Sequence, residues 1–162
     1  ILIMRPLKET VYPRRYDSNV NKNILKEFYI PTLSNSIEYW RVASYFRSSA
    51  FLANALGMAK FIKNGGRIKL IVNVELDKND FLAIEKGERS EEGFIEDYFN
   101  GEIKEIKNSI SNDRYQFLSW LIASKRLEIR VAYVEKNIEH SKYGIFFDKE
   151  NNKVSFNGSI NE

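Results

Sequence analysis

Apolar residues recur along the chain with two different periods, and their order predicts strands and helices in turn. Residues 37–46 are typical of a first strand, and Ser48 or Ser49 can cap the helix that follows it. The apolar stripe expected on this helix consists of Leu52, Ala55, Leu56, Ala59 and Ile62. Gly65-Gly66 then ends the helix.

Further strands and helices are predicted after this first unit. The nearly continuous apolar run 68–74 indicates a strand buried on both faces of a parallel sheet, reached by a right-handed crossover. Residues 77–111 are charged and helix-forming, and one or two amphipathic helices there are expected to cover the sheet. The apolar positions of these helices are Phe94, Ile95, Tyr98, Phe99, Ile103 and Ile106. Asn112 or Asp113 starts a helix that is apolar nearly all round, and residues 127–134 form the next strand. The fold class expected is α/β, with a mixed, largely parallel β-sheet flanked by helices.

Composition and charge narrow the class of protein. A length of 162 residues with 43% hydrophobic residues suits one domain with its own core, preceded by an irregular, basic arm at residues 1–27. This arm can contact a phosphate backbone, lie in solvent or pack on a neighbour. No apolar run is long enough for a membrane span, and no signal-peptide pattern is present. Cysteine is absent, so the expected location is cytoplasmic. A net charge of +3 only weakly favours an acidic partner.

One two-part motif contains the candidate chemistry. It begins at the only histidine, in His140-Ser141-Lys142, and continues in Gly158-Ser159-Ile160-Asn161. The polar residues 148–153 between the two parts predict a turn, and therefore a hairpin. We expect its apolar face to combine Tyr143, Ile145 and Phe147 with Val154, Phe156 and Ile160. The opposite, polar face is expected to present His140, Lys142, Ser159 and Asn161.

These side chains suit an attack on a phosphodiester. Histidine can act as nucleophile or general acid near neutral pH, lysine supplies a positive charge, and serine and asparagine donate hydrogen bonds to phosphoryl oxygens. Such a set needs no metal or other cofactor, and a chain with one histidine and no cysteine cannot build a conventional zinc site. Either half of the motif alone is more often structural, but the two together in this order favour a phosphodiesterase site.

At HSKYGIFFD followed by NGSINE, the sequence resembles the phospholipase D superfamily, whose signature is His-x-Lys followed by Gly-Ser-x-Asn. Residues 28–46 are similar to the opening of phospholipase D-like domains that precede helicases in bacterial restriction and defence proteins. The resemblance implies that His140, Lys142 and Asn161 are catalytic, and that Ser159, Lys142 and Asn161 bind phosphate. Glu162 and Asp148 are candidates for an acid that orients the histidine. Asp148 stands one residue further from the lysine than the signature has, and it can instead open the turn.

The resemblance also implies a function and partners. The reaction needs a nucleophile and a leaving-group acid on opposite sides of phosphorus, so we expect a homodimer through the His140 sites, or a second motif outside this chain. DNA is the expected substrate, because short members with one motif tend to be nucleases; a lipid or a small phosphodiester stays open. Residues 28–162 are expected to be a phospholipase D-like domain that is incomplete at its C-terminus, with a helicase region beyond it. The alternative is an inactive DNA-binding or dimerisation module attached to a helicase, and no membrane partner is expected.

Overall fold

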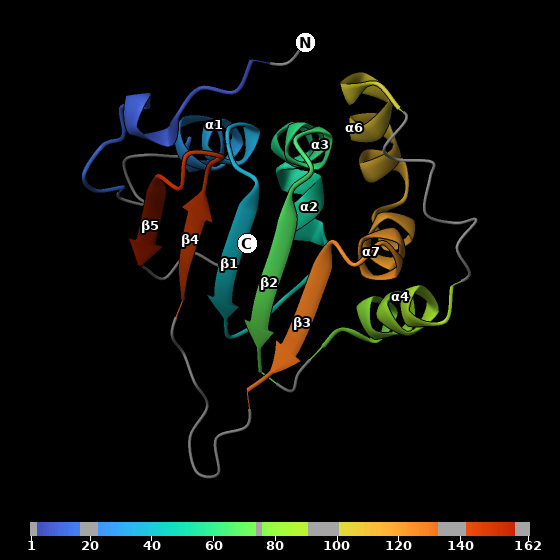
Figure 1. Ribbon diagram of the computed structural model, residues 1–162. Helices are drawn as coiled ribbons and strands as arrows, with labels where there is room; N and C mark the ends of the chain where they lie inside the picture. Colours follow the sequence, from blue (N-terminus) through green and yellow to red (C-terminus); the bar gives the residue numbers. More distant parts are fainter. Residues whose placement is uncertain (1–2, 17–22, 74–75, 91–100, 133–141, 158–162) are drawn as a thin grey trace.

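The protein folds around a five-stranded mixed sheet (Figure 1). The computed structural model describes residues 3–16, 23–73, 76–90, 101–132 and 142–157. Its strands, in the spatial order β3-β2-β1-β4-β5, are β1 (Glu38–Ala43), β2 (Arg67–Val72), β3 (Leu127–Val131), β4 (Tyr143–Phe147) and β5 (Lys153–Asn157). β2 is parallel to both of its neighbours, whereas β4 is antiparallel to both of its own. The expected α/β fold with a mixed sheet is confirmed, although half of its strand pairings are parallel rather than most of them.

The described helices lie behind the strands or beside them in Figure 1. They are η1 (Leu7–Glu9), η2 (Leu25–Tyr29), α1 (Ile30–Ser34), α2 (Ser49–Ala53), α3 (Ala55–Lys63), α4 (Lys78–Glu88), α6 (Ile103–Asn112) and α7 (Arg114–Ala123). The core lies between these helices and the sheet. Its large side chains, among them Tyr29, Phe61, Phe117, Trp120 and Phe146, are completely or almost completely buried.

Only one face of the sheet is covered by the described helices. In β2 the side chains of Ile68, Leu70 and Val72 are buried, whereas Lys69 and Ile71 between them are exposed. The prediction that this strand is buried on both faces is therefore wrong for its described part. The charged side chains of Arg67 and Lys69 would be costly to bury without partners, and here they remain on the solvent side.

The helix predicted after β1 is divided in two. Asn54, with φ −105° and ψ 20°, ends α2 and begins α3. Because of this break, Leu52 and Leu56 of the predicted apolar stripe are 41% and 37% exposed, and the other members of the stripe are buried. Gly65, with φ 83°, follows the end of α3 as predicted, since glycine adopts positive φ without a steric penalty.

The N-terminal residues pack on this domain rather than extending from it. Leu7 is 1% exposed, and Tyr12 and Tyr16 contact Phe28 edge-on, with ring centroids 5.5 and 5.7 Å away. The expected boundary between residues 27 and 28 falls inside η2. Of the three alternatives for the basic arm, packing is the one that these contacts favour, and the surface it packs on belongs to the same chain.

The remaining helices follow the predicted order, but α4 packs on α7 and α6 packs on α3, rather than covering the sheet as predicted. Asp113 starts α7, and its carboxylate accepts a hydrogen bond of 2.9 Å from the backbone N–H of Gln116. α7 is buried from Phe117 to Leu121, as its apolar sequence predicted. Ile103 and Ile106 lie on α6. The predicted positions Phe94, Ile95, Tyr98 and Phe99 lie outside the described residues. In the ranges given above, no helix is both long and apolar enough to cross a membrane.

Candidate active site

The predicted hairpin between the two parts of the motif is present. β4 and β5 pair antiparallel, with Tyr143 opposite Asn157 and Phe147 opposite Lys153. Lys142 directly precedes Tyr143 and is half-buried, whereas His140, Ser159, Asn161 and Glu162 lie outside the described residues. The first part of the motif ends directly before Tyr143, and the second part begins directly after Asn157. The hairpin pairs these two residues.

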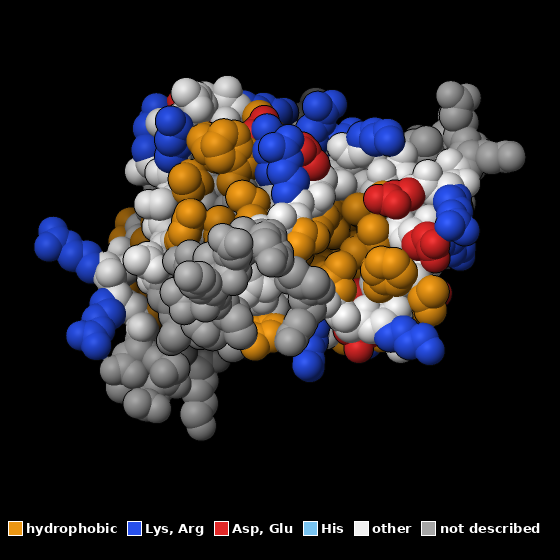
Figure 2. Space-filling model, turned by 90° about the horizontal axis from the view of Figure 1, so that it is seen from below, with side chains coloured by type: hydrophobic (Ala, Val, Ile, Leu, Met, Phe, Trp, Pro, Cys, Tyr) orange, Lys and Arg blue, Asp and Glu red, His pale blue; other side chains and the backbone are white. Residues whose placement is uncertain are grey.

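These positions lie at one edge of the sheet. Tyr143 and Asn157 continue a row across all five strands that also contains Val42, Ile71 and Arg130. The row is close to the carboxyl ends of the parallel strands β1, β2 and β3, and ligands of α/β proteins bind most often at such an edge. Figure 2 looks onto this edge, where hydrophobic side chains gather and Lys and Arg side chains stand at the margins.

The hairpin does not combine its side chains in the way we expected. Gly144 lies opposite Phe156, and Phe146 lies opposite Val154, so positions of equal parity share a face. The prediction that Tyr143, with its alternate neighbours along β4, shares an apolar face with Val154 and Phe156 is therefore wrong. The expected polar face fails for the same reason, because this register places Lys142 on the opposite face from Asn157, the position that alternates in sequence with Ser159 and Asn161. The physical reason is register: Phe146 is fully buried against the core, and a shift by one residue would turn it to the other face.

Asp148 lies at the far end of β4 from Lys142, roughly 20 Å away along an extended chain. Its carboxylate accepts hydrogen bonds from the backbone N–H groups of Leu7 (2.7 Å), Asn152 (2.8 Å) and Glu150 (2.9 Å), and from the Asn152 side chain (2.8 Å). Burial acts to raise the pKa of this carboxyl, but these hydrogen bonds outweigh it and lower the pKa below its ordinary value. Asp148 thus holds the turn and the N-terminal segment. This agrees with the alternative given above, that Asp148 opens the turn.

A buried arginine lies beside the hairpin, and the sequence analysis missed it. Arg41 of β1 pairs with Gly144, is 4% exposed, and its guanidinium carbon lies 4.8 Å from the centroid of the Phe156 ring. A Cβ atom on Gly144 would lie 2.5 Å from that ring, so glycine is what allows Phe156 to lie there. Arg41 alternates along β1 with Tyr39 and Ala43, whose side chains face the core. A charged residue among core-facing positions is the sequence feature that could have indicated this buried arginine.

The cavity next to Arg41 is too small for a substrate. It has a volume of about 30 Å³ and is lined in part by Asn54 and Tyr45, which gives room for a water molecule rather than a ligand. Any substrate site formed by the motif therefore lies outside this cavity.

The loop after β1 is fixed to the helices by buried polar contacts. The backbone N–H of Ser48 donates a 3.0 Å hydrogen bond to Asp80, and the side chain of Arg114 donates a 3.2 Å bond to the Ser48 hydroxyl. Ser48 stands at the N-cap position of α2, as one prediction had it, but its side chain makes no capping hydrogen bond there. These contacts hold the loop at the same edge of the sheet as Lys142.

Comparison with known proteins gave no match. No protein-family model, curated protein or solved structure is significantly similar to this chain. The resemblance to the phospholipase D superfamily therefore stays a prediction from the sequence.

The described part of the edge offers positive charge and hydrogen-bond donors. Lys142 precedes β4 and Arg130 lies on β3, so both are at this edge with β1 and β2 between their strands. No group of His, Asp or Glu side chains that could hold a metal ion occurs within the described ranges. Cations and neutral donors bind phosphate oxygens well, so the arrangement suits an anionic phosphodiester.

Proposed function

We propose that this chain is a metal-independent phosphodiesterase, a DNA endonuclease domain that acts through a phosphohistidine on His140. The observation that supports it is the pairing of Tyr143 with Asn157, because the two parts of the motif continue from these adjacent positions. His140 and Gly158 are 18 positions apart in the sequence, yet the described residues nearest to each of them lie next to each other in the sheet. A chance occurrence of two short motifs gives no reason for such a meeting.

In the proposed reaction, a nitrogen of the His140 imidazole bonds to phosphorus while the bond from phosphorus to the leaving oxygen breaks. Lys142, Ser159 and Asn161 hold the phosphoryl oxygens as negative charge grows on them. The imidazolium of a second copy's His140 protonates the leaving oxygen. Water then attacks phosphorus and gives its proton to that second histidine, and the P–N bond breaks to free the first.

The orienting acid in this proposal is Glu162. Asp148 is occupied by four hydrogen bonds at the other end of β4, so its carboxylate is committed to the turn. A carboxylate next to the motif is the simpler partner for an imidazole, since it keeps the ring in one tautomer and stabilises its protonated form.

The first test is cleavage of plasmid and single-stranded DNA in the presence of EDTA, with wild type compared with His140→Ala. We expect wild type to cleave and the variant to lose at least about a hundredfold in rate, as for the loss of a nucleophile. Phe81→Ala, a change of an exposed residue on α4, is the control for a contaminating nuclease and for general damage. Cleavage that stops in EDTA, or that persists in His140→Ala, contradicts the proposal.

The second test looks for the covalent intermediate. A labelled oligonucleotide is mixed with the protein, and the reaction is stopped with alkaline denaturant, because phosphohistidine is labile in acid. The single histidine makes the assignment direct: a labelled protein band in wild type that is absent in His140→Ala identifies the nucleophile. Salt-sensitive DNA binding by a folded wild type that neither cleaves nor forms the adduct supports instead the inactive DNA-binding module.

A further inference from the structure

Aromatic rings stand on the uncovered face of the sheet, here called the open face, which is formed by the side chains that alternate with the core-facing ones. Trp40 of β1 is 41% exposed and Tyr143 of β4 is 46% exposed. Trp40 lies opposite Ile145, so Tyr143 is its diagonal neighbour at about 7–8 Å. The ring of Phe147 lies 4.8 Å from that of Trp40 on the other side. The rings therefore form a short line across two adjacent strands.

A hollow of about 400 Å³ lies beside these rings. Its lining includes Trp40, Val42, Lys69, Ile71 and Tyr143 from the three central strands. This volume is within the range of small-ligand pockets and is large enough for a nucleobase.

Positive charge surrounds the rings. Among the described strand residues, the open face has four cationic side chains, Arg67, Lys69, Arg130 and Lys153, and two acidic ones, Glu38 and Glu128. Glu128 is paired with Arg130 at 2.7 Å, and Glu38 accepts a hydrogen bond of 2.9 Å from the Trp40 indole.

Two of the lysines lie directly over aromatic rings. The ammonium of Lys69 is 4.9 Å from the centroid of the Trp40 ring, and that of Lys153 is 5.6 Å from the centroid of the Phe147 ring. A base that stacks on the Trp40 ring therefore takes the place of the Lys69 ammonium, and the flexible lysine side chain keeps that ammonium within reach of the phosphate of the bound strand.

We propose that the open face binds single-stranded nucleic acid, with bases stacked on Trp40 and Tyr143 and phosphates held by Lys69, Lys153 and Arg67. Exposed rings flanked by cations are the combination that single-strand-binding surfaces use, because every base has a face that can stack. In a duplex the bases are already stacked on each other, so their faces are not available to Trp40 and Tyr143. A second copy docked through the same face would bring two positively charged surfaces together, so charge favours the polyanion.

This inference goes beyond the proposed function and does not rest on it. Tyr143 is adjacent in sequence to Lys142, so a strand bound on the open face leads to the edge where the motif begins. Binding is nevertheless a property of the face alone. It can be measured in the His140→Ala variant, where cleavage by the proposed mechanism does not occur.

The test is fluorescence anisotropy of a labelled oligo-dT with His140→Ala protein, compared with the same protein that also has Trp40→Ala. Loss of one stacking platform is expected to raise the Kd about 5- to 150-fold, which corresponds to about 1–3 kcal/mol. Phe81→Ala removes a ring of similar exposure, 53%, from α4 and is expected to leave the Kd unchanged. Thermal unfolding of each variant shows whether the protein remains folded.

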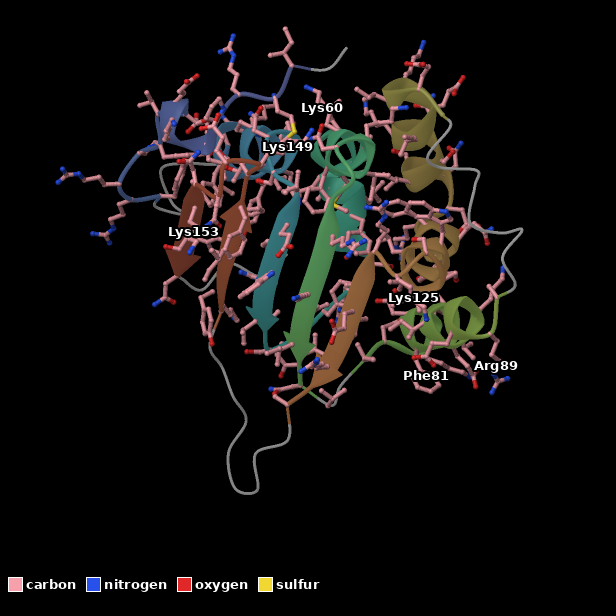
Figure 3. All side chains as sticks on the ribbon, viewed as in Figure 1. Lys60, Phe81, Arg89, Lys125, Lys149 and Lys153 are labelled. Atoms are coloured by element: carbon pink, nitrogen blue, oxygen red, sulfur yellow. The ribbon has the colours of Figure 1, made fainter. Side chains whose placement is uncertain are left out.

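A charge variant keeps the test decisive if Trp40→Ala is unstable. Lys69→Gln is expected to weaken binding and to reduce the slope of log K against log salt by about 0.7. Lys60→Gln removes a lysine from α3, in the helical layer, and is expected to change neither. Figure 3 shows the two control positions, Lys60 and Phe81, on the helices, apart from Lys153 on β5.

Quenching of tryptophan fluorescence gives an independent readout. The chain has two tryptophans, and Trp120 is fully buried, so quenching by oligo-dT reports stacking on Trp40. The proposal is overturned if oligo-dT does not bind, if duplex DNA binds as tightly, or if Trp40→Ala and Lys69→Gln bind like their controls. A concentration-dependent dimer that Trp40→Ala dissolves would assign the open face to a second copy instead.

Discussion

At the scale of single residues, the Asp148 carboxylate joins three segments of the chain. It accepts hydrogen bonds from Leu7 in the N-terminal segment and from Glu150 and Asn152 in the turn, while it directly follows β4. The residue is 4% exposed, so these bonds replace water that the folded chain excludes. A carboxylate that was a candidate for chemistry is therefore important for folding.

We expect Asp148→Asn to lower the free energy of unfolding by about 1–3 kcal/mol at neutral pH, because the amide has one acceptor oxygen and no charge. Urea denaturation followed by circular dichroism measures this. Glu150→Gln is the control, since its ion pair with Lys8 is exposed to solvent and contributes little to stability. Equal stability of the two variants would show that the Asp148 bonds do not hold the turn.

The same variant gives a pH dependence with a defined sign. The pKa of Asp148 is lowered in the folded protein, so its contribution is fully present above the unfolded pKa of about 3.9 and is lost as the pH falls through the lower folded value. The stability difference between wild type and Asp148→Asn is therefore expected to shrink as the pH is lowered from neutral to below about 4. A difference that stays constant over this range would contradict the lowered pKa.

The motif residues could be found from sequence, but their orientation could not. Spacing and residue type identify His-x-Lys and Gly-Ser-x-Asn without a structure, and alternation correctly predicts that the intervening segments are strands. Which faces combine depends on the register of β4 against β5, and a shift by one residue reverses it. That register follows from the burial of Phe146 and from the close contact of Gly144 with Phe156, neither of which is visible in one strand alone.

At the scale of elements, α4 and α7 pack unusually closely. A Cβ atom on Gly87 of α4 would collide with the backbone oxygen of Ser119 on α7 and would lie 2.8 Å from Ile122 Cβ. The Ser119 hydroxyl in turn donates a 2.7 Å hydrogen bond to the carbonyl of Ala83. Since a backbone oxygen cannot move aside as a side chain does, the glycine sets the distance between the two helices.

Gly87→Ala is therefore expected to destabilise the protein by about 1–3 kcal/mol, through overpacking between the two helices. Helix propensity alone predicts the opposite sign, since alanine in an isolated helix is favoured over glycine by about 1 kcal/mol. Glu88→Ala, at the next and exposed position of α4, is the control with little expected change. A stabilised Gly87→Ala protein, measured by chemical denaturation, would show that the helices separate at no cost.

The order and type of the helices and strands followed from periodicity. Which faces of the sheet the helices cover did not. The apolar α7 was recognisable as a buried helix, and Gly65 as the end of α3, from local sequence alone. The apolar run of β2 was read as buried on both faces, although Arg67 and Lys69 already showed the two-residue alternation of a half-buried strand. Whether a sheet face is covered depends on segments distant in sequence, which the pattern of one strand does not contain.

At the scale of the whole molecule, the proposed chemistry requires a second histidine, from another copy or from a second motif outside this sequence, and the arrangement proposed here is the dimer. With one histidine, a single copy supplies either the nucleophile or the acid, but not both. A two-fold axis close to the motif edge would give each copy's His140 a partner, since an isologous contact places the same residue on both sides. Tyr143 belongs both to the open face and to the sheet edge where the motif lies in the sequence. The dimer axis must therefore leave the open face accessible if the dimeric site and the binding of single strands are both correct.

Mixing of subunits tests this arrangement directly. Wild type and His140→Ala are mixed in equal amounts, the copies are allowed to exchange, and cleavage is measured in EDTA at the same total protein concentration as an all-wild-type sample. If two histidines share each site, mixed dimers are inactive, and roughly a quarter of the activity of an all-wild-type sample remains, against roughly a half if each chain works alone. Lys60→Gln mixed with wild type in the same way is the control, because a lysine on α3 has no part in the proposed site and full activity is expected. Activity proportional to the wild-type fraction would rule out a shared pair of histidines and require the leaving-group acid to come from another residue of the same chain.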